Sequence, residues 1–338
     1  MIDFILQKLK ELTSIDSPSG FTFRAKEYVL DELKSLGYAP QENKKGCVFC
    51  DLGGSGNPLI LSAHIDTLGG MVAEVKANGR LKLTKIGGLR PENIETENCK
   101  VWTRGGKTVE GTFQLNNPSI HVNGNYATTP RDFDNMEVVL DEKTTNKADT
   151  LALGIEVGDY VCFDPRTVVT KSGYIKSRFL DDKLSVAILL GVAKYIKDNK
   201  VNLNRKVVIF ISVYEEIGHG ASSLPFDIEE MLCVDMGCVG EGLNCTEREC
   251  SICVKDSAGP SNFEMTSKLV DLAKKNKIAV ALDVYPFYSS DADAGLSAGN
   301  DFKHCLIGAG VYASHGYERS HVDGVTATLD LIVAYLSE

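Results

Sequence analysis

The sequence predicts an α/β protein with a doubly wound, largely parallel sheet and an inserted all-β, barrel-like domain. Near-continuous apolar runs are typical of strands buried on both faces, and helical periodicity lies between them. Between residues 69 and 171 this periodicity disappears, and short alternating runs are separated by Gly, Asn and Pro. We therefore expect an α/β domain formed by 1–68 and 172–338, and a β domain formed by 69–171.

Composition limits the classes of function. The chain has 338 residues, is 43% hydrophobic and 24% charged, and carries a net charge of −10. These values are ordinary for a globular protein. The acidic balance argues against phosphate backbones and anionic membranes, so we expect no nucleic-acid partner and no membrane partner.

Cysteine spacing and the first residues indicate the compartment. Ten cysteines are scattered, and the Cys47-x-x-Cys50 pair has no second pair at zinc-ribbon spacing, so we expect reduced thiols. The N-terminal segment has the pattern of an amphipathic helix rather than of a signal peptide. No run approaches the roughly 20 apolar residues that span a bilayer. These features predict a cytoplasmic protein.

The first part of the α/β domain contains two helices and two strands. An apolar stripe predicts a helix over Ile2–Leu12, and a second helix is expected over Phe23–Leu36, closed by Gly37. Strands are predicted over Val48–Leu52 and Pro58–Ala63, and the second strand leads into His64-Ile65-Asp66.

The inserted domain has weaker signals. Alternating runs predict strands over Met71–Val75, Leu81–Leu83, Thr112–Leu115 and Tyr160–Phe163. Asp132–Thr150 is highly polar, and we expect either a helix or a mobile flap there.

The α/β pattern then resumes. Apolar stripes predict helices over Asp181–Asn199, Phe263–Lys275 and Val322–Leu336. Apolar runs predict strands over Val207–Val213, Met231–Asp235, Ile252–Val254, Ala279–Val284 and His304–Gly308.

Side chains that can bind metal ions follow these strands or precede the helices. They are His64, Asp66, Asp181, Asp182, Glu215, Glu216, Asp235 and the segment from His315 to His321. Because the carboxyl ends of parallel strands meet at one edge of a sheet, we expect these side chains to lie together. A mixture of imidazole and carboxylate suits Zn²⁺, Co²⁺ or Mn²⁺.

Each of these residues also has a structural interpretation. His64 and Asp66 could be a histidine and its hydrogen-bonded carboxylate, and Asp181 with Asp182 could cap a helix. Their joint occurrence favours a site, because helix capping does not call for paired acids at successive strand ends.

Six ordered segments together resemble the two-metal aminopeptidases that include the tetrahedral, glutamyl and deblocking aminopeptidases, some of which are labelled endoglucanases. The segments are LSAHIDTLGGMV, KSRFLDDKLSVA, VYEEIGHGAS, CVDMG, SSDADAGLSAG and IGAGVYASHGYERSH. The resemblance covers essentially the whole chain. It implies a co-catalytic zinc-type peptidase domain, with the insertion serving in dimerisation and the dimers assembling further, up to a dodecamer.

The resemblance also implies roles for the first residues of the list. His64 would bind one metal ion. Asp66 would hydrogen-bond the free imidazole nitrogen and orient the ring for catalysis. Asp181 would bridge the two metal ions, and Asp182 would support it.

The remaining roles follow in the same way. Glu216 would complete the first metal site, and Asp235 would bind the second metal. His315 would supply the last ligand, with His321 as the alternative, whose structural role would be to begin the last helix. Glu215 would act as general base and acid on a water shared by the two ions.

Two residues are candidates for substrate binding. Asp293, in the segment ADAG that resembles the family's TDAG, could shape the substrate pocket or could simply begin a helix. His219, where the family often has an apolar or basic residue, could line the pocket or lie in a turn.

The sequence thus predicts a self-associating aminopeptidase that acts on peptides with two divalent ions, Zn or Co. A related two-metal carboxypeptidase or N-acyl amino acid deacylase is the enzymatic alternative, and a non-catalytic peptide-binding scaffold is the alternative from another class. An endoglucanase is disfavoured, because glycosidases need two carboxylates that flank a sugar rather than histidines interleaved with acids.

Overall fold

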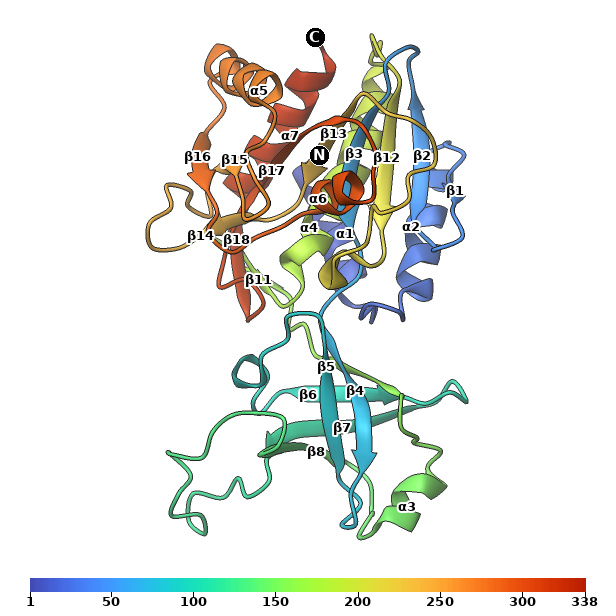
Figure 1. Ribbon diagram of the computed structural model, residues 1–338, viewed down its shortest axis with the longest axis vertical. Coiled ribbons are helices and arrows are strands. Elements are labelled where there is room, and N and C mark those ends of the chain that lie inside the picture. Colours follow the sequence, from blue (N-terminus) through green and yellow to red (C-terminus); the bar gives the residue numbers. More distant parts are fainter. The chain divides into compact units, whose positions relative to one another are not determined.

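The computed structural model describes residues 1–338 and divides them into two compact units. The α/β unit contains residues 1–66 and 166–338, and the barrel unit contains residues 67–165 (Figure 1). None of the helices combines the length and the apolar character needed to cross a bilayer.

The α/β unit is built on a 12-stranded sheet whose main path runs β1-β2-β12-β3-β13-β17-β18-β11-β10. Off this path, β14 and β15 pair with β17, and β16 pairs with β15. The strands are β1 (Gln41–Glu42), β2 (Val48–Gly53), β3 (Leu59–His64), β10 (Val168–Val169), β11 (Tyr174–Ser177), β12 (Val207–Ser212), β13 (Glu230–Val234), β14 (Gly237–Val239), β15 (Cys250–Lys255), β16 (Val280–Val284), β17 (Lys303–Tyr312) and β18 (Glu318–His321). The neighbours β12, β3, β13 and β17 are parallel. The flanking pairs β1–β2, β2–β12, β17–β18, β18–β11 and β11–β10 are antiparallel. The α/β class is confirmed, with the parallel part at the centre of the sheet.

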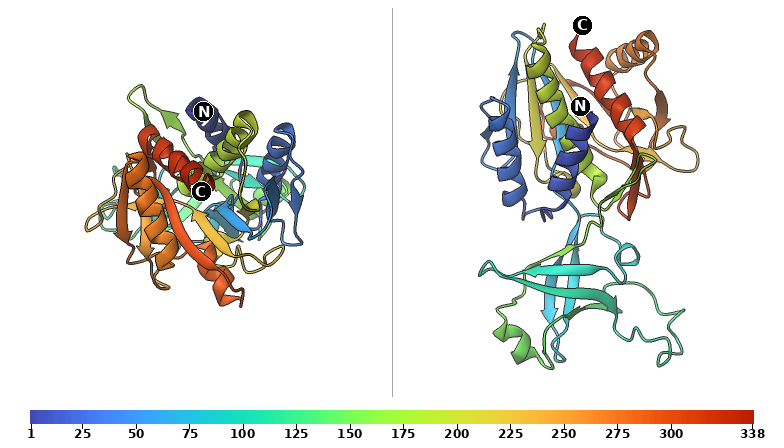
Figure 2. Two further views of the ribbon diagram at one scale, coloured as in Figure 1. Left: turned by 90° about the horizontal axis from the view of Figure 1, so that it is seen from above. Right: turned by 180° about the vertical axis from the view of Figure 1, so that it is seen from behind.

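Helices cover this sheet. They are α1 (Ile2–Thr13), α2 (Phe23–Ser35), α4 (Leu180–Asn199), α5 (Phe263–Asn276), α6 (Asp291–Ser297) and α7 (Val322–Leu336). The helices α1, α4 and α7 pack against one another on one face, and α6 lies on the opposite face (Figures 1 and 2). Because both faces are covered, every residue of β3 and of β12 is buried.

Helix α4 begins irregularly. Asp181 and Asp182 have non-helical dihedral angles, and the peptide bond between them is cis. Regular helix therefore starts after these two acids, and their side chains belong to the turn that precedes it.

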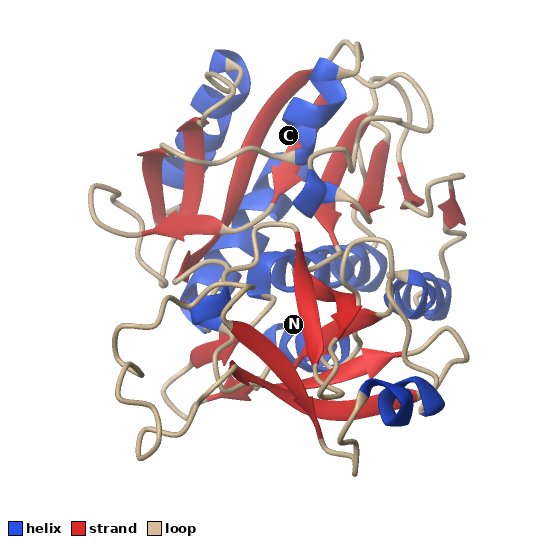
Figure 3. Cartoon of the chain, turned by 60° about the horizontal axis from the view of Figure 1, so that its bottom comes forward, coloured by secondary structure: helices blue, strands red, loops and turns tan.

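The barrel unit is a closed barrel with the strand order β4-β5-β8-β7-β6-β9. Its strands are among those drawn in red in Figure 3. Its elements are β4 (Gly69–Val75), β5 (Leu81–Ile86), the 3₁₀ turn Pro91–Asn93, β6 (Asn98–Trp102), β7 (Thr108–Leu115), β8 (Met136–Leu140), α3 (Lys147–Ala152) and β9 (Tyr160–Phe163). Phe113 and Phe163 meet edge to face, with ring centroids 6.0 Å apart. Closure leaves the barrel without free edge strands.

The expectation of a helix or flap over Asp132–Thr150 is wrong for its centre, which forms the barrel strand β8. Met136, Val138 and Leu140 are buried, and Glu137 is buried as an ion pair with Lys76 and Arg80. The polar residues on both sides of this short strand hid its alternation. Only the end of the segment is helical, in α3.

All ten cysteines are free, and nine of them are buried, as expected for reduced thiols.

Candidate active site

Four parallel strands end at one edge of the sheet, and each leads into side chains selected from the sequence. β3 ends at His64, which pairs in register with Ser212, the last residue of β12. Glu215 and Glu216 follow β12 in a 3₁₀ turn, Glu215–Ile217. Asp235 comes directly after β13, and His315 comes shortly after β17.

Asp181 lies at the centre of the cluster, with its two carboxylate oxygens directed to different histidines. Its Oδ1 is 3.0 Å from Nε2 of His64, which is also 3.9 Å from Oδ2 of Asp235. Its Oδ2 is 3.5 Å from Nε2 of His315, which is also 3.7 Å from Oε2 of Glu216. The result is two adjacent sets of ligand atoms that share one carboxylate.

Glu215 and Asp182 border these sets. Oε2 of Glu215 is 3.6 Å from Nε2 of His64, and its side chain is 14% exposed, so a small molecule can reach it. Oδ2 of Asp182 accepts the backbone N–H of His64 at 3.1 Å. Asp182 thereby holds the end of β3 in place.

His321 lies outside the cluster. Its Nε2–H donates to the carbonyl of Ser172, and its Nδ1 accepts the N–H of Asp323. Both ring nitrogens are therefore used, and the second contact caps the first turn of α7.

The carboxylate of Asp66 anchors the turn that carries the two glutamates. It accepts the N–H groups of Glu215 at 3.1 Å and of Glu216 at 3.3 Å, together with the hydroxyl of Ser19. Nδ1–H of His64 donates to the backbone carbonyl of Asp66 at 3.0 Å, whereas the carboxylate lies 3.6 Å away. The ring is thus oriented mainly by the carbonyl, and the carboxylate serves chiefly the glutamate turn.

Lys45 holds the loop that follows this turn. Its Nζ donates to the carbonyls of His219 and Gly220. The side chain of His219 is exposed and stacks on the ring of Tyr214, with centroids 4.8 Å apart. His219 therefore belongs to a surface turn.

Helix α6 fixes the same loop from the other side through Asp291 rather than Asp293. Oδ1 of Asp291, which is buried, accepts the N–H of Ala221 at 2.9 Å. A Cβ at Gly220 would lie 2.1 Å from this oxygen, so the contact requires glycine. Asp293 forms a capping box with Ser290, the helix-start role considered above.

Burial raises the pKa values of four acids in the cluster, and neighbouring carboxylates add to the effect. The pKa of Asp235 is raised to about 7 by burial and by the charge of Asp181. Burial likewise holds the pKa values of Asp182, Glu215 and Glu216 well above their usual range. This concentration of negative charge, withdrawn from water, attracts cations.

His64 and Asp181 have pKa shifts that favour their charged forms. Burial favours a low pKa for His64, but the carboxylates of Glu215 and Asp181 outweigh it and raise that pKa well above the usual value. Burial also opposes ionisation of Asp181, yet hydrogen bonds from His315 and His64 lower its pKa. The shared carboxylate is therefore ionised.

The residues fit divalent cations. In each of two groups of three residues, the ligand atoms lie within 4.8 Å of one another; the groups are His64, Asp182 and Asp235, and His64, Asp181 and Glu216. Oδ1 of Asp182 and Oε1 of Glu216 are buried without a hydrogen-bond partner. Buried carboxylate oxygens are seldom left unpaired, and imidazole with carboxylate is a donor set for zinc-like ions.

Sequence reasoning missed two acids that this region uses. Glu318 is 2% exposed and accepts backbone N–H groups of both Asp181 and His315. Burial and the charge of Asp181 raise its pKa to about 8. Asp291 was overlooked in favour of Asp293. Both acids lie in segments that the sequence had already singled out, Glu318 in IGAGVYASHGYERSH and Asp291 in SSDADAGLSAG.

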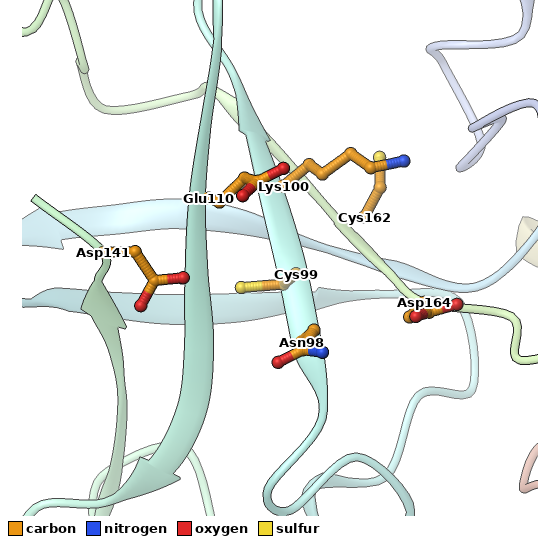
Figure 4. A pocket seen from close by; sticks show the side chains of 8 residues that line it. Asn98, Cys99, Lys100, Glu110, Asp141, Cys162 and Asp164 are labelled. Atoms are coloured by element: carbon orange, nitrogen blue, oxygen red, sulfur yellow. The ribbon is translucent and has the colours of Figure 1, made fainter.

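A separate hollow lies on the barrel unit (Figure 4). Its lining includes Asn98, Cys99, Lys100, Glu110, Asp141, Cys162 and Asp164. Burial, with the charge of Asp141, raises the pKa of Cys99 to about 12, so its thiol is not a nucleophile near neutral pH. None of these residues belongs to the two ligand groups, which both lie in the α/β unit.

A family model described as M42 glutamyl aminopeptidase matches residues 46–331. The chain belongs to this family. The Bacillus subtilis (strain 168) protein YhfE, which is named as an aminopeptidase, is 43% identical over 334 residues, 98% of this chain and 96% of YhfE. The family resemblance seen in the sequence is confirmed, and this M42 member is a peptide hydrolase of the aminopeptidase type.

Solved structures agree with this fold. The TET1 peptidase of Pyrococcus horikoshii has a TM-score of 0.87 at 22% identity, with 99% of each chain covered. A Thermotoga maritima structure described as an endoglucanase has a TM-score of 0.76 at 17% identity, covering 97% of this chain and 96% of that one. The endoglucanase label noted above thus occurs among the structural neighbours of this M42 protein.

Replacing Asp66 by Asn should loosen the glutamate turn. The amide NH₂ cannot accept a backbone N–H, so one of the partly buried N–H groups of Glu215 and Glu216 loses its partner. We expect a loss of about 1–3 kcal/mol in the free energy of unfolding. Hydrogen exchange at these two amides should become faster.

Asp51→Asn is the matched control, because Asp51 also accepts a backbone N–H, that of Gly53, but is exposed. It should change neither quantity by a comparable amount. Unaltered exchange at residues 215 and 216 in Asp66→Asn would contradict the anchoring role.

Proposed function

We propose that this M42-family enzyme is a metalloaminopeptidase that uses two divalent cations, Zn or Co, to remove N-terminal residues from peptides. The observation that carries the proposal is the pair of oxygens of Asp181, at 3.0 Å from His64 and 3.5 Å from His315. One carboxylate between two sets of ligand atoms is the arrangement expected for a bridging ligand.

In this proposal, His64, Asp181 and Asp235 hold one cation, and Asp181, Glu216 and His315 hold the other. Asp182 is a supporting residue, since one of its oxygens already binds the backbone N–H of His64. Two divalent ions would balance the buried negative charge that raises the pKa values of the acids.

Two cations held by these residues would supply a water of lowered pKa and would polarise the scissile carbonyl. Glu215, which is not among the ligands, takes a proton from the attacking water as the new C–O bond forms. It then gives the proton to the departing amine as the C–N bond breaks. Asp66 keeps Glu215 in position by accepting the backbone N–H of Glu215.

The acidic surroundings favour an exopeptidase acting at the N-terminus. A free α-amino group is a cation, and the cluster offers carboxylates to receive it. A carboxypeptidase would instead need a cationic group for the substrate's terminal carboxylate. An N-acyl amino acid deacylase would accept a blocked amine.

Glu215→Gln should lower kcat on peptides with a free N-terminus by about 10²–10⁴-fold, because the proton carrier is lost. The metal content, measured by atomic emission, should stay at two ions per chain. Acetylated peptides should be poor substrates of the wild type.

Glu241→Gln makes the same change at an exposed glutamate of the α/β unit and should leave kcat unchanged. Full activity of Glu215→Gln would overturn the mechanism. A preference for acetylated substrates would favour the deacylase.

His315→Ala and His321→Ala should separate the two candidate ligands. His315→Ala is expected to retain only one tightly bound cation and to lose activity. His321→Ala should keep both cations but lose about 0.5–2 kcal/mol of folding stability, because the cap of α7 is removed. Metal analysis and denaturant unfolding check both variants, and the reverse pattern would make His321 the ligand.

We also propose that the chain self-associates, with the barrel unit serving in dimerisation and the dimers assembling further. The support is that TET1 of Pyrococcus horikoshii is described as assembling into a tetrahedron or a large octahedral shell, and a PhTET1 structure as a dodecamer. Light scattering of the full chain should give a mass of at least a dimer. A monomer at micromolar concentration would contradict the proposal.

A further inference from the structure

Glu318 joins two segments of the candidate site that are far apart in the sequence. Its Oε2 accepts the N–H of Asp181, 137 positions away, at 3.2 Å. Its Oε1 accepts the N–H of His315 at 3.1 Å. Both oxygens are thus used for backbone groups, so the side chain acts on the site through its neighbours.

The sheet determines where Glu318 lies. It is the first residue of β18 and pairs in register with Ser177, the last residue of β11. The chain continues from Ser177 to Asp181 within four residues, and His315 comes three residues before Glu318. The pairing of β18 with β11 therefore places the carboxylate of Glu318 between the backbones of Asp181 and His315.

The backbone N–H groups of Asp181 and His315 both need a hydrogen-bond acceptor. Asp181 precedes the regular part of α4, where N–H groups have no partner within the helix. His315 has a φ of 61°, a left-handed conformation that costs a non-glycine residue free energy unless contacts hold it. A buried N–H left unpaired costs further free energy.

We propose that Glu318 is a positioning residue that sets the affinity of the cation site between Asp181 and His315. This inference rests on the proposed two-cation function. Without Glu318, the left-handed turn at His315 relaxes and the imidazole leaves the oxygen of Asp181 that it faces. In the site formed by His64, Asp181 and Asp235, His64 stays at the end of β3 and Asp235 stays directly after β13, so this site is affected less.

The test is titration of the metal-free, full-length protein with Co²⁺, followed by calorimetry and visible absorption. In Glu318→Gln, one acceptor oxygen becomes an NH₂ group that cannot accept an N–H. One of the two Co²⁺ binding steps should weaken about 10–100-fold, the range seen for residues that support metal ligands. The other step should change less. Glu318→Asp, which keeps the charge but is one methylene shorter, should weaken the same step to a smaller extent.

Glu137→Gln is the matched control, because Glu137 is 1% exposed and bonds to two side chains in the barrel unit. It should lower the thermal unfolding temperature without changing either binding step. This comparison distinguishes positioning from a general loss of stability.

The outcomes separate the two proposals. A wild type that binds no Co²⁺ overturns the proposed function itself. A wild type that binds two ions, with both Glu318 variants matching it step for step, overturns the role of Glu318 alone. The role of Glu318 is also overturned if both Co²⁺ binding steps weaken equally and in proportion to the loss of folding stability. If Glu318→Gln does not fold, Glu318→Asp decides the result.

Discussion

Repulsion between buried carboxylates is the constraint on which the rest of the α/β unit depends. Asp235, Glu215, Glu216 and Asp182 surround Asp181 where little water reaches, and burial raises their pKa values. Such a cluster opposes its own folding unless opposite charge is supplied and the backbone cannot spread apart. Imidazoles supply part of that charge, and the fully covered parallel strands β12, β3, β13 and β17 supply the rigidity.

A second set of acids limits how far the backbone can spread apart, because these acids accept hydrogen bonds from backbone N–H groups instead of binding cations. Asp66 holds the glutamate turn, Asp291 holds the loop beyond it, and Glu318 holds the segments of Asp181 and His315. Each of these carboxylates accepts at least one N–H, the positive end of a peptide dipole, which offsets part of the cost of burying the acid. The separation is not complete, because Asp235 among the proposed ligands also accepts a backbone N–H, that of Met236 at 2.6 Å.

The sequence predicted the features that depend on local pattern. The apolar runs of β3 and β12 are buried along their whole length, and the acids that follow them do meet at one edge. The sequence did not predict the features that depend on tertiary contacts. The strand β8 is short and flanked by polar residues, so its alternation was not visible. His315 and His321 lie in one segment, and only the path of the chain directs one to Asp181 and the other to Ser172. The same applies to Asp291 and Asp293, which differ in the side of α6 from which they project.

The barrel unit interrupts the chain between the two halves of the cluster, since His64 and Asp66 precede residues 67–165 and Asp181 follows them. The entropy lost in closing a loop grows only with the logarithm of its length, by about 0.6 kcal/mol for each doubling. The contact between His64 and Asp181 is therefore almost insensitive to how much chain is inserted. The inserted unit can thus diverge in length and surface while the catalytic chemistry stays the same.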